Sequence, residues 1–273
     1  MKKITAVICI VLFSLILAQA AFAQAAGRSS EGVRGQSLNG TTGLCYIPTG
    51  NIGWEGGKAA LDIGYRTIIN NDAGASHIPA ITLSLANWIE IAAAFDIQPN
   101  VGSQSNDDLL LGLKFRLPTS AAVALGCNIQ FINIGDDYRD WTSFQPYVAI
   151  TYPGTFFTMR AETTLVFGKT FFSGLSNNSD IDFGMGFDLI LFPDVFGNTV
   201  HWLIDFSNFN YNSDAWPHNP AGHRGVMNTG VRIDLSTIPS FSKYKFLIDL
   251  ILNDVFDDGH RSFIAGAVFG LRL

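Results

Sequence analysis

The chain has 273 residues, of which 48% are hydrophobic and 12% aromatic. Only 15% are charged, against about 25% in typical soluble domains. This composition argues against a disordered chain, and the formal net charge of −6 argues against a protein that binds nucleic acid through a basic surface. Three cysteines are too few for a disulfide-rich scaffold.

Residues 1–23 have the layout of a secretory signal peptide. Lys2 and Lys3 form a positive start, an apolar stretch follows, and Ala21-Phe22-Ala23 is a cleavage site of the A-x-A type. We therefore predict export and a mature chain that begins at Gln24. An uncleaved anchor is the alternative, but the apolar stretch is shorter than the ~20 residues of a spanning helix.

Residues 24–56 are rich in Gly and Ser and show no sustained alternation of apolar and polar residues. Three roles remain open for them. They form a periplasmic lead-in, they plug the lumen of the domain that follows, or they include a short extra strand at 42–47.

Residues 57–273 alternate between apolar and other residues, which is the period of a β-strand with two different faces. The clearest case is 180–192, where Phe183, Met185 and Phe187 alternate with Asp182, Gly184 and Gly186. About twelve such segments follow one another. None contains the ~18 consecutive apolar residues of a membrane helix.

The row opposite the apolar one carries charges of both signs, interspersed with glycine and alanine. We predict that these charged side chains line an interior: Lys58, Asp62, Arg66, Glu90, Asp96, Asp108, Lys114, Arg116, Arg160, Glu162, Asp180, Asp182, Asp188, Asp205, Arg232, Asp234, Lys245, Asp249 and Arg272.

Alternation alone leaves open whether the apolar row faces a protein core, as in a soluble sandwich, or faces lipid. Three features favour lipid. The segments have the ~9–11 residues of a strand that crosses a bilayer. Connections that look short, at 86–87, 118–120 and 153–155, alternate with long ones, at 68–76, 99–107, 135–143, 169–178 and 211–223. Aromatic residues such as Trp88, Trp202 and Tyr244 lie near segment ends, where interfacial girdles belong.

We therefore predict an all-β protein, a closed antiparallel up-and-down transmembrane β-barrel of about 12 strands, with about 10 to 14 possible. Its location is the outer membrane of a Gram-negative-type cell, with lipid around it. The amphipathic final segment, 263–273, resembles the signal that the barrel-assembly machinery reads, although Leu273 stands where that signal usually has an aromatic residue.

A more specific resemblance lies in Gly40-Thr41-Thr42-Gly43-Leu44, followed by Ile47-Pro48-Thr49 and by Gly64-Tyr65. These residues resemble the opening of the YjbH-type outer-membrane proteins, a family associated with exopolysaccharide production. The match covers about a dozen residues, and Gly50 stands where the family usually has Ala. The resemblance implies a link to polysaccharide export; the alternative is a simple turn that leads into a barrel strand.

The predicted function follows from the interior. A barrel of ~12 strands lies between small barrels filled by side chains and large ones with a water channel. We expect a narrow or gated passage for small solutes, with cations favoured by the slight acidic excess. The alternative is a closed ion network in a structural barrel that transports nothing.

We expect no enzymatic activity, no cofactor and no metal. The outward rows are expected to lack the Ser and His of a barrel phospholipase. A second alternative is a hydrolase with a rim site or a weak metal site in the loops, which hold His218, His223 and His260 beside Asp214, Asp257 and Asp258. Cys127 is expected to act as a small outward hydrophobe, and Gly112→Ser on the opposite row is expected to have little effect.

Overall fold

The computed structural model describes residues 34–54, 58–70, 74–99, 107–119, 121–132, 141–156, 159–173, 181–208, 225–256 and 261–273. The predicted signal peptide at 1–23 and Asp180 lie outside these ranges. Within them, no helix is long and apolar enough to cross a membrane.

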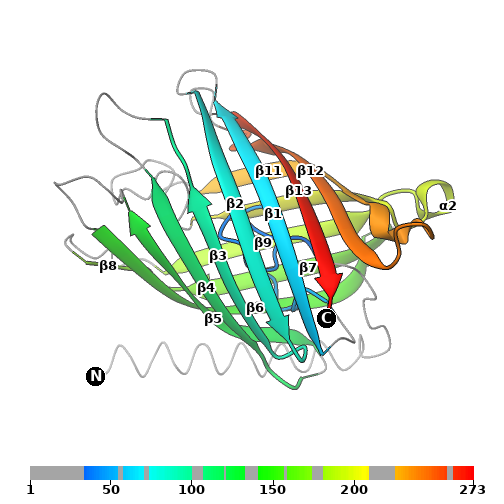
Figure 1. Cartoon of the computed structure of the whole chain (residues 1–273), viewed down its shortest axis with the longest axis horizontal. Helices are drawn as coiled ribbons and strands as arrows, with labels where there is room; N and C mark the ends of the chain where they lie inside the picture. The colour runs from blue at the N-terminus through cyan, green and yellow to red at the C-terminus, as the bar shows by residue number, and fades with distance from the viewer. Residues whose placement is uncertain are drawn as a thin grey trace.

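Most of the described chain is β-strand (Figure 1). The strands are β1 (Ala59–Asn70), β2 (Gly74–Leu85), β3 (Ile89–Asp96), β4 (Asp108–Arg116), β5 (Ala122–Ile132), β6 (Trp141–Phe156), β7 (Met159–Gly168), β8 (Phe171–Ser173), β9 (Asp182–Ile190), β10 (Val200–Ser207), β11 (Val226–Asp234), β12 (Tyr244–Asn253) and β13 (Ser262–Arg272). The short helices α2 (Pro193–Phe196) and η1 (Leu235–Thr237) lie in two connections.

The strands close into a barrel because every strand pairs antiparallel with its neighbours and β1 pairs with β13. β7 and β8 together form one barrel strand, since both pair with β6 in one register, Tyr147 opposite Gly168 and Phe144 opposite Phe171. Pro146, which cannot donate a backbone hydrogen bond, lies opposite the interruption. The predicted closed antiparallel barrel of about 12 strands is therefore confirmed.

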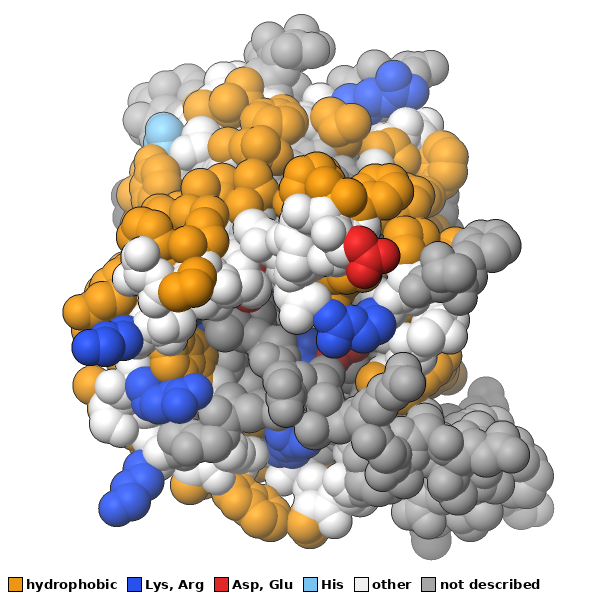
Figure 2. All heavy atoms as spheres, turned by 90° about the vertical axis from the view of Figure 1, so that its right-hand side faces the viewer, with side chains coloured by type: hydrophobic (Ala, Val, Ile, Leu, Met, Phe, Trp, Pro, Cys, Tyr) orange, Lys and Arg blue, Asp and Glu red, His pale blue; other side chains and the backbone are white. Residues whose placement is uncertain are grey.

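The two faces of the strands differ as the alternation predicted. On β1, Ile63 is 55% exposed, whereas its neighbour Asp62 is 1% exposed. The outward rows include Ile81, Ile91 and Phe269, all well exposed, and Figure 2 shows hydrophobic side chains over much of one face of the molecule. The apolar side chains thus cover the outer wall, and the charged rows turn inward.

Two predicted connections are wrong. The stretch 68–76 is not a long loop, because β1 continues to Asn70 and β2 begins at Gly74. The stretch 153–155 is not a turn but part of β6, paired with β7 from Glu162 to Arg160. β6 extends here beyond Ala122, the first residue of β5, so Pro153 stands where one neighbouring strand is missing and its absent N–H is tolerated.

The barrel has two distinct ends. We call the end where β1 begins and β13 finishes the terminal mouth; its connections are 86–88, 117–121, 157–158, 191–199 and 235–243. The opposite end, the loop mouth, carries the connections 71–73, 97–107, 133–140, 174–181, 208–225 and 254–261.

Candidate functional site: the filled lumen

Residues 34–54, which we call the inner segment, lie inside the barrel (blue in Figure 1). Every one of these residues is buried. The segment forms compact loops joined by isolated bridges, Gln36 with Thr42 and Gly43 with Pro48, and no strand forms at 42–47. Its polar backbone groups therefore need partners on the barrel wall.

Both ends of the inner segment lie near the terminal mouth. Arg34 forms an ion pair with Glu162 near the start of β7. At the other end, Lys245 near the start of β12 donates to the Gly53 carbonyl at 3.1 Å, and Arg272 lies over the Trp54 ring at 4.6 Å. The two ends of the inner segment thus lie near the same mouth.

Basic side chains of the wall hold the segment by its carbonyl groups. Arg66 donates to the carbonyls of Gln36 and Ser37, the latter at 3.1 Å. Arg232 donates to the Gly43 carbonyl at 3.2 Å and to that of Leu44 at 3.5 Å.

Lys114 and Glu90 together bracket one residue of the segment. Lys114 donates to the Thr42 carbonyl at 3.0 Å and pairs with Glu90 at 3.0 Å. Glu90 accepts the Thr42 amide at 2.7 Å, the Thr42 hydroxyl, and the Gly53 amide at 3.1 Å.

Asp205 on β10 holds the middle of the segment. One of its oxygens accepts the backbone N–H groups of Cys45, Tyr46 and Ile47, at 2.8, 2.7 and 3.4 Å. The other oxygen accepts the Asn228 amide at 2.7 Å. Successive amides that converge on one carboxylate form an anion-binding concavity. The negative charge of Asp205 is thus held by the segment itself.

Some of the wall charges also form ion pairs with one another. Asp249 bridges two arginines, accepting from Arg232 at 2.7 and 3.0 Å and from Arg66 at 3.3 Å. Lys245 pairs with Asp62 at 2.6 Å. Because charges buried in a low-dielectric interior need partners, these pairs stabilise the charged side chains that form them.

Glycines on the inner rows make room for the segment. A Cβ atom at Gly64 would overlap the Gln36 side chain, and one at Gly112 would overlap the Thr41 methyl group. The Leu44 side chain approaches Gly186 in the same way. The expectation that Gly112→Ser would have little effect is therefore wrong, because its side chain would push against the buried Thr41.

An apolar layer also lines part of the lumen, and the sequence analysis missed it. Leu38, Leu44 and Ile47 of the segment belong to one buried cluster with inward side chains of the wall. The wall members include Ile68, Ile78, Leu110, Val226, Ile251 and Ile264. The sequence did contain a signal for this apolar layer, because isoleucines lie on the row that was otherwise predicted to face water.

The predicted lumen-lining residues fall into four groups. Those buried in the interior are Asp62, Arg66, Glu90, Asp96, Asp108, Lys114, Asp182, Asp205, Arg232, Asp234, Lys245 and Asp249. Those partly buried are Arg116, Glu162 and Asp188. Those exposed near the terminal mouth are Lys58, Arg160 and Arg272. Asp180 is not among the described residues.

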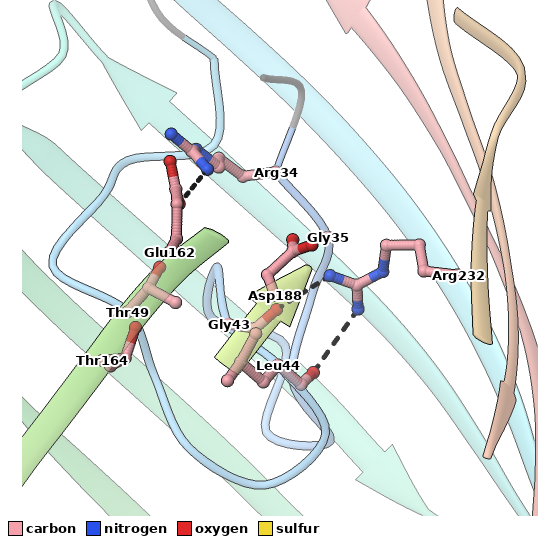
Figure 3. A pocket seen from close by; sticks show the side chains of 9 residues that line it. All are labelled: Arg34, Gly35, Gly43, Leu44, Thr49, Glu162, Thr164, Asp188 and Arg232. Atoms are coloured by element: carbon pink, nitrogen blue, oxygen red, sulfur yellow. Dashed lines mark hydrogen bonds and ion pairs between the residues drawn. The ribbon is translucent and has the colours of Figure 1, made fainter. Parts of the chain in front are cut away.

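A small pocket remains between the segment and the wall, next to Arg34 and Arg232 (Figure 3). Its other lining residues are Gly35, Gly43, Leu44, Thr49, Glu162, Thr164 and Asp188. It has room for roughly one water molecule. Figure 3 shows Arg34 directed at Glu162 and Arg232 at the Leu44 carbonyl.

The reactivity of the Cys45 thiol can show whether the inner segment lies in the lumen. The thiol is free and buried, and burial raises its pKa well above the ordinary value. Because the thiolate is the reactive form, we expect Cys45 to resist maleimide in the folded protein and to react when the segment leaves the lumen. The measurement is the labelling rate in a Cys127→Ser background, native and unfolded; equal rates would contradict the buried placement.

Two features of the described residues bear on the enzymatic alternatives. They contain no cluster of three or more His, Cys, Asp or Glu side chains suited to a metal ion. The loop residues His218, His223, His260, Asp214, Asp257 and Asp258 lie outside them. One expectation is wrong: the β1–β2 pair carries a histidine on its outward row, His77, whose Nδ1 lies 2.6 Å from the Tyr65 hydroxyl.

No protein-family model matches the chain, and no curated protein matches it by sequence. Solved structures match it by fold. A KdgM porin in complex with disordered oligogalacturonate gives a TM-score of 0.50 at 10% identity, over 76% of this chain and 98% of that one. Omp33 of Acinetobacter baumannii gives 0.47 at 10% identity, over 80% and 100%. The COG4313 outer membrane channel of Pseudomonas putida F1 gives 0.41 at 12% identity, over 82% and 96%.

At 10% identity the similarity to the KdgM porin shows the fold alone. Together with the strand pairing and the outward apolar rows, it defines the class of protein. The chain has the fold of a 12-stranded outer-membrane β-barrel, with residues 34–54 of the same chain bound inside it.

Proposed function

We propose that the protein is an outer-membrane passage for small solutes that its own inner segment closes at rest. The observation that carries this proposal is the way the wall holds the segment. Glu90, Asp205, Arg66 and Arg232 are directed at backbone groups of residues 36–53. The same side chains would line a hydrophilic passage once the segment withdraws.

Withdrawal is topologically simple. Because both ends of the inner segment lie near the terminal mouth, the segment can leave without threading through the barrel. Water can then replace its contacts with the charged wall. A structural barrel, the alternative, is filled by the side chains of its own strands.

Location and partners follow from the outer wall. Its apolar rows would contact lipid, and the closed strand pairing leaves no unpaired backbone edge in hydrocarbon. We infer an outer-membrane location, reached after cleavage of the signal peptide and insertion by the barrel-assembly machinery.

The open passage is proposed to favour cations. Among the described strand residues, eight buried acids face four buried bases: Asp62, Glu90, Asp96, Asp108, Asp182, Asp205, Asp234 and Asp249 against Arg66, Lys114, Arg232 and Lys245. A wall with this excess attracts positive charge and repels anions.

Planar-bilayer recording tests the passage with the full chain. We expect the native protein to open only in rare steps, and Gly112→Leu to give frequent cation-selective steps because leucine occupies the space of Thr41. The control is Leu191→Ala, a change on a partly exposed residue next to α2. A Gly112→Leu barrel that shows heat-modifiable migration and yet never conducts would establish the structural alternative. A variant that lacks residues 24–54 provides a second route to the open state.

The resemblance to YjbH-type proteins adds a second solute class, oligosaccharides linked to exopolysaccharide export. Its motif, residues 40–49, forms the centre of the inner segment, where Thr42 and Gly43 meet the wall. The KdgM porin, solved with oligogalacturonate, shares only the fold. Flux of neutral oligosaccharides through the Gly112→Leu barrel tests this class.

A further inference from the structure

The wall recognises the inner segment mainly through its peptide backbone. All four buried bases of the described strands donate to segment carbonyls. The acceptors are the carbonyls of Gln36, Ser37, Thr42, Gly43, Leu44 and Gly53. Two wall carboxylates, Glu90 and Asp205, accept the amides of Thr42, Cys45, Tyr46, Ile47 and Gly53.

At two of these sites, the wall binds both the N–H group and the carbonyl group of a single residue. The Glu90–Lys114 pair binds the N–H and the carbonyl of Thr42 at 2.7 and 3.0 Å. Glu90 and Lys245 bind the N–H and the carbonyl of Gly53, each at 3.1 Å. Gly53 has no side chain, so this recognition depends on the backbone alone.

We propose that the lumen is a binding site for peptide backbone and that the passage takes short peptides without net negative charge. This inference rests on the proposed passage and names its solute class. Amide carbonyls and amide N–H groups form charge-assisted hydrogen bonds with the arginine, lysine and carboxylate groups that already hold the segment. Inner glycines such as Gly64 and Gly186 leave room for a chain that carries small side chains.

The same wall is less suited to acidic saccharides. Their carboxylates would meet an interior in which buried acids outnumber buried bases. A solute peptide would instead compete with the inner segment for Asp205 and Glu90. Because the segment is tethered, its effective concentration is in the millimolar range, and a free peptide must be present at comparable concentration.

Displacement of the segment in the full chain tests the proposal without relying on conduction. The protein, in a Cys127→Ser background, is incubated with a neutral peptide of glycine, serine and threonine, and the maleimide labelling rate of Cys45 is measured. We expect the rate to rise at least tenfold. The matched control is the same peptide with alternate amides N-methylated, which removes N–H donors and retains the side chains; it should leave the rate unchanged.

Two further arms separate the alternatives. A neutral oligosaccharide and an oligogalacturonate of similar size should leave the labelling rate unchanged. The peptide assignment would be overturned if the N-methylated peptide raised the labelling rate as much as the unmodified peptide does. It would also be overturned if either saccharide raised the rate more than the unmodified peptide does. Peptides could raise the labelling rate of Cys45 while the Gly112→Leu barrel never conducts in the bilayer. That result would support the peptide-binding site and contradict the proposed passage.

Discussion

Asp249→Asn should lower the free energy of unfolding by about 3–5 kcal/mol, the usual cost of removing one partner from a buried ion pair. Asp249 is 1% exposed and bridges Arg66 and Arg232. Without its charge, two guanidinium groups remain close together in the interior with no carboxylate between them. Urea unfolding of the refolded barrel, followed by heat-modifiable migration, measures the effect.

Two variants control for this result. Asp194→Asn removes an exposed acid from α2 and should change the unfolding free energy by less than about 0.5 kcal/mol. The double variant Asp249→Asn with Arg232→Gln should cost less than the sum of the single changes, because each removes the partner of the other. If the losses in unfolding free energy were additive, the interaction between Asp249 and Arg232 would contribute nothing to stability.

Leu113→Arg should lower the free energy of unfolding in bilayers by about 2–4 kcal/mol, the cost of a charge on the lipid face near the membrane centre. Leu113 lies on an outward row of β4, between Ile91 and Cys127 on the neighbouring strands. Phe187→Arg on β9 should behave in the same way. Unfolding is measured in liposomes, so that an outward residue of a membrane barrel contacts lipid. In the alternative of a soluble protein, the same residue would not contact lipid.

Ile238→Arg is the matched control, because Ile238 is exposed in the connection 235–243 beyond the strand ends. It should cost no more than about 1 kcal/mol, the value found near the interface. Equal costs at Leu113 and Ile238 would contradict a lipid-facing outer wall.

The barrel itself was predictable from sequence because its signal is local. Each strand residue faces either the lipid or the interior, so Ile63 and Asp62 report the two faces directly. The errors at 68–76 and 153–155 arose where this local signal is weak. Proline and glycine at 153–154 look like a turn, but only the missing neighbour of β6 shows why they are tolerated there.

The filled lumen was less accessible because its contacts connect distant positions. Cys45 and Asp205 are 160 residues apart, and the inner segment has no periodicity that would fix its place. The inner rows did contain two signals: glycines at 64, 112 and 186, which the segment approaches, and isoleucines such as Ile251 and Ile264, which it covers. Both features make sense only when something occupies the lumen.

A reversible lock between segment and wall tests most directly whether the inner segment closes the passage. Leu44→Cys and Gly186→Cys place two thiols at a point of close approach, in a background with Cys45 and Cys127 changed to Ala. We predict formation of this disulfide, no current from the oxidised barrel, and single-channel steps from the same barrel after reduction. Identical recordings in the two states, or failure of the thiols to join in a folded barrel, would contradict the account.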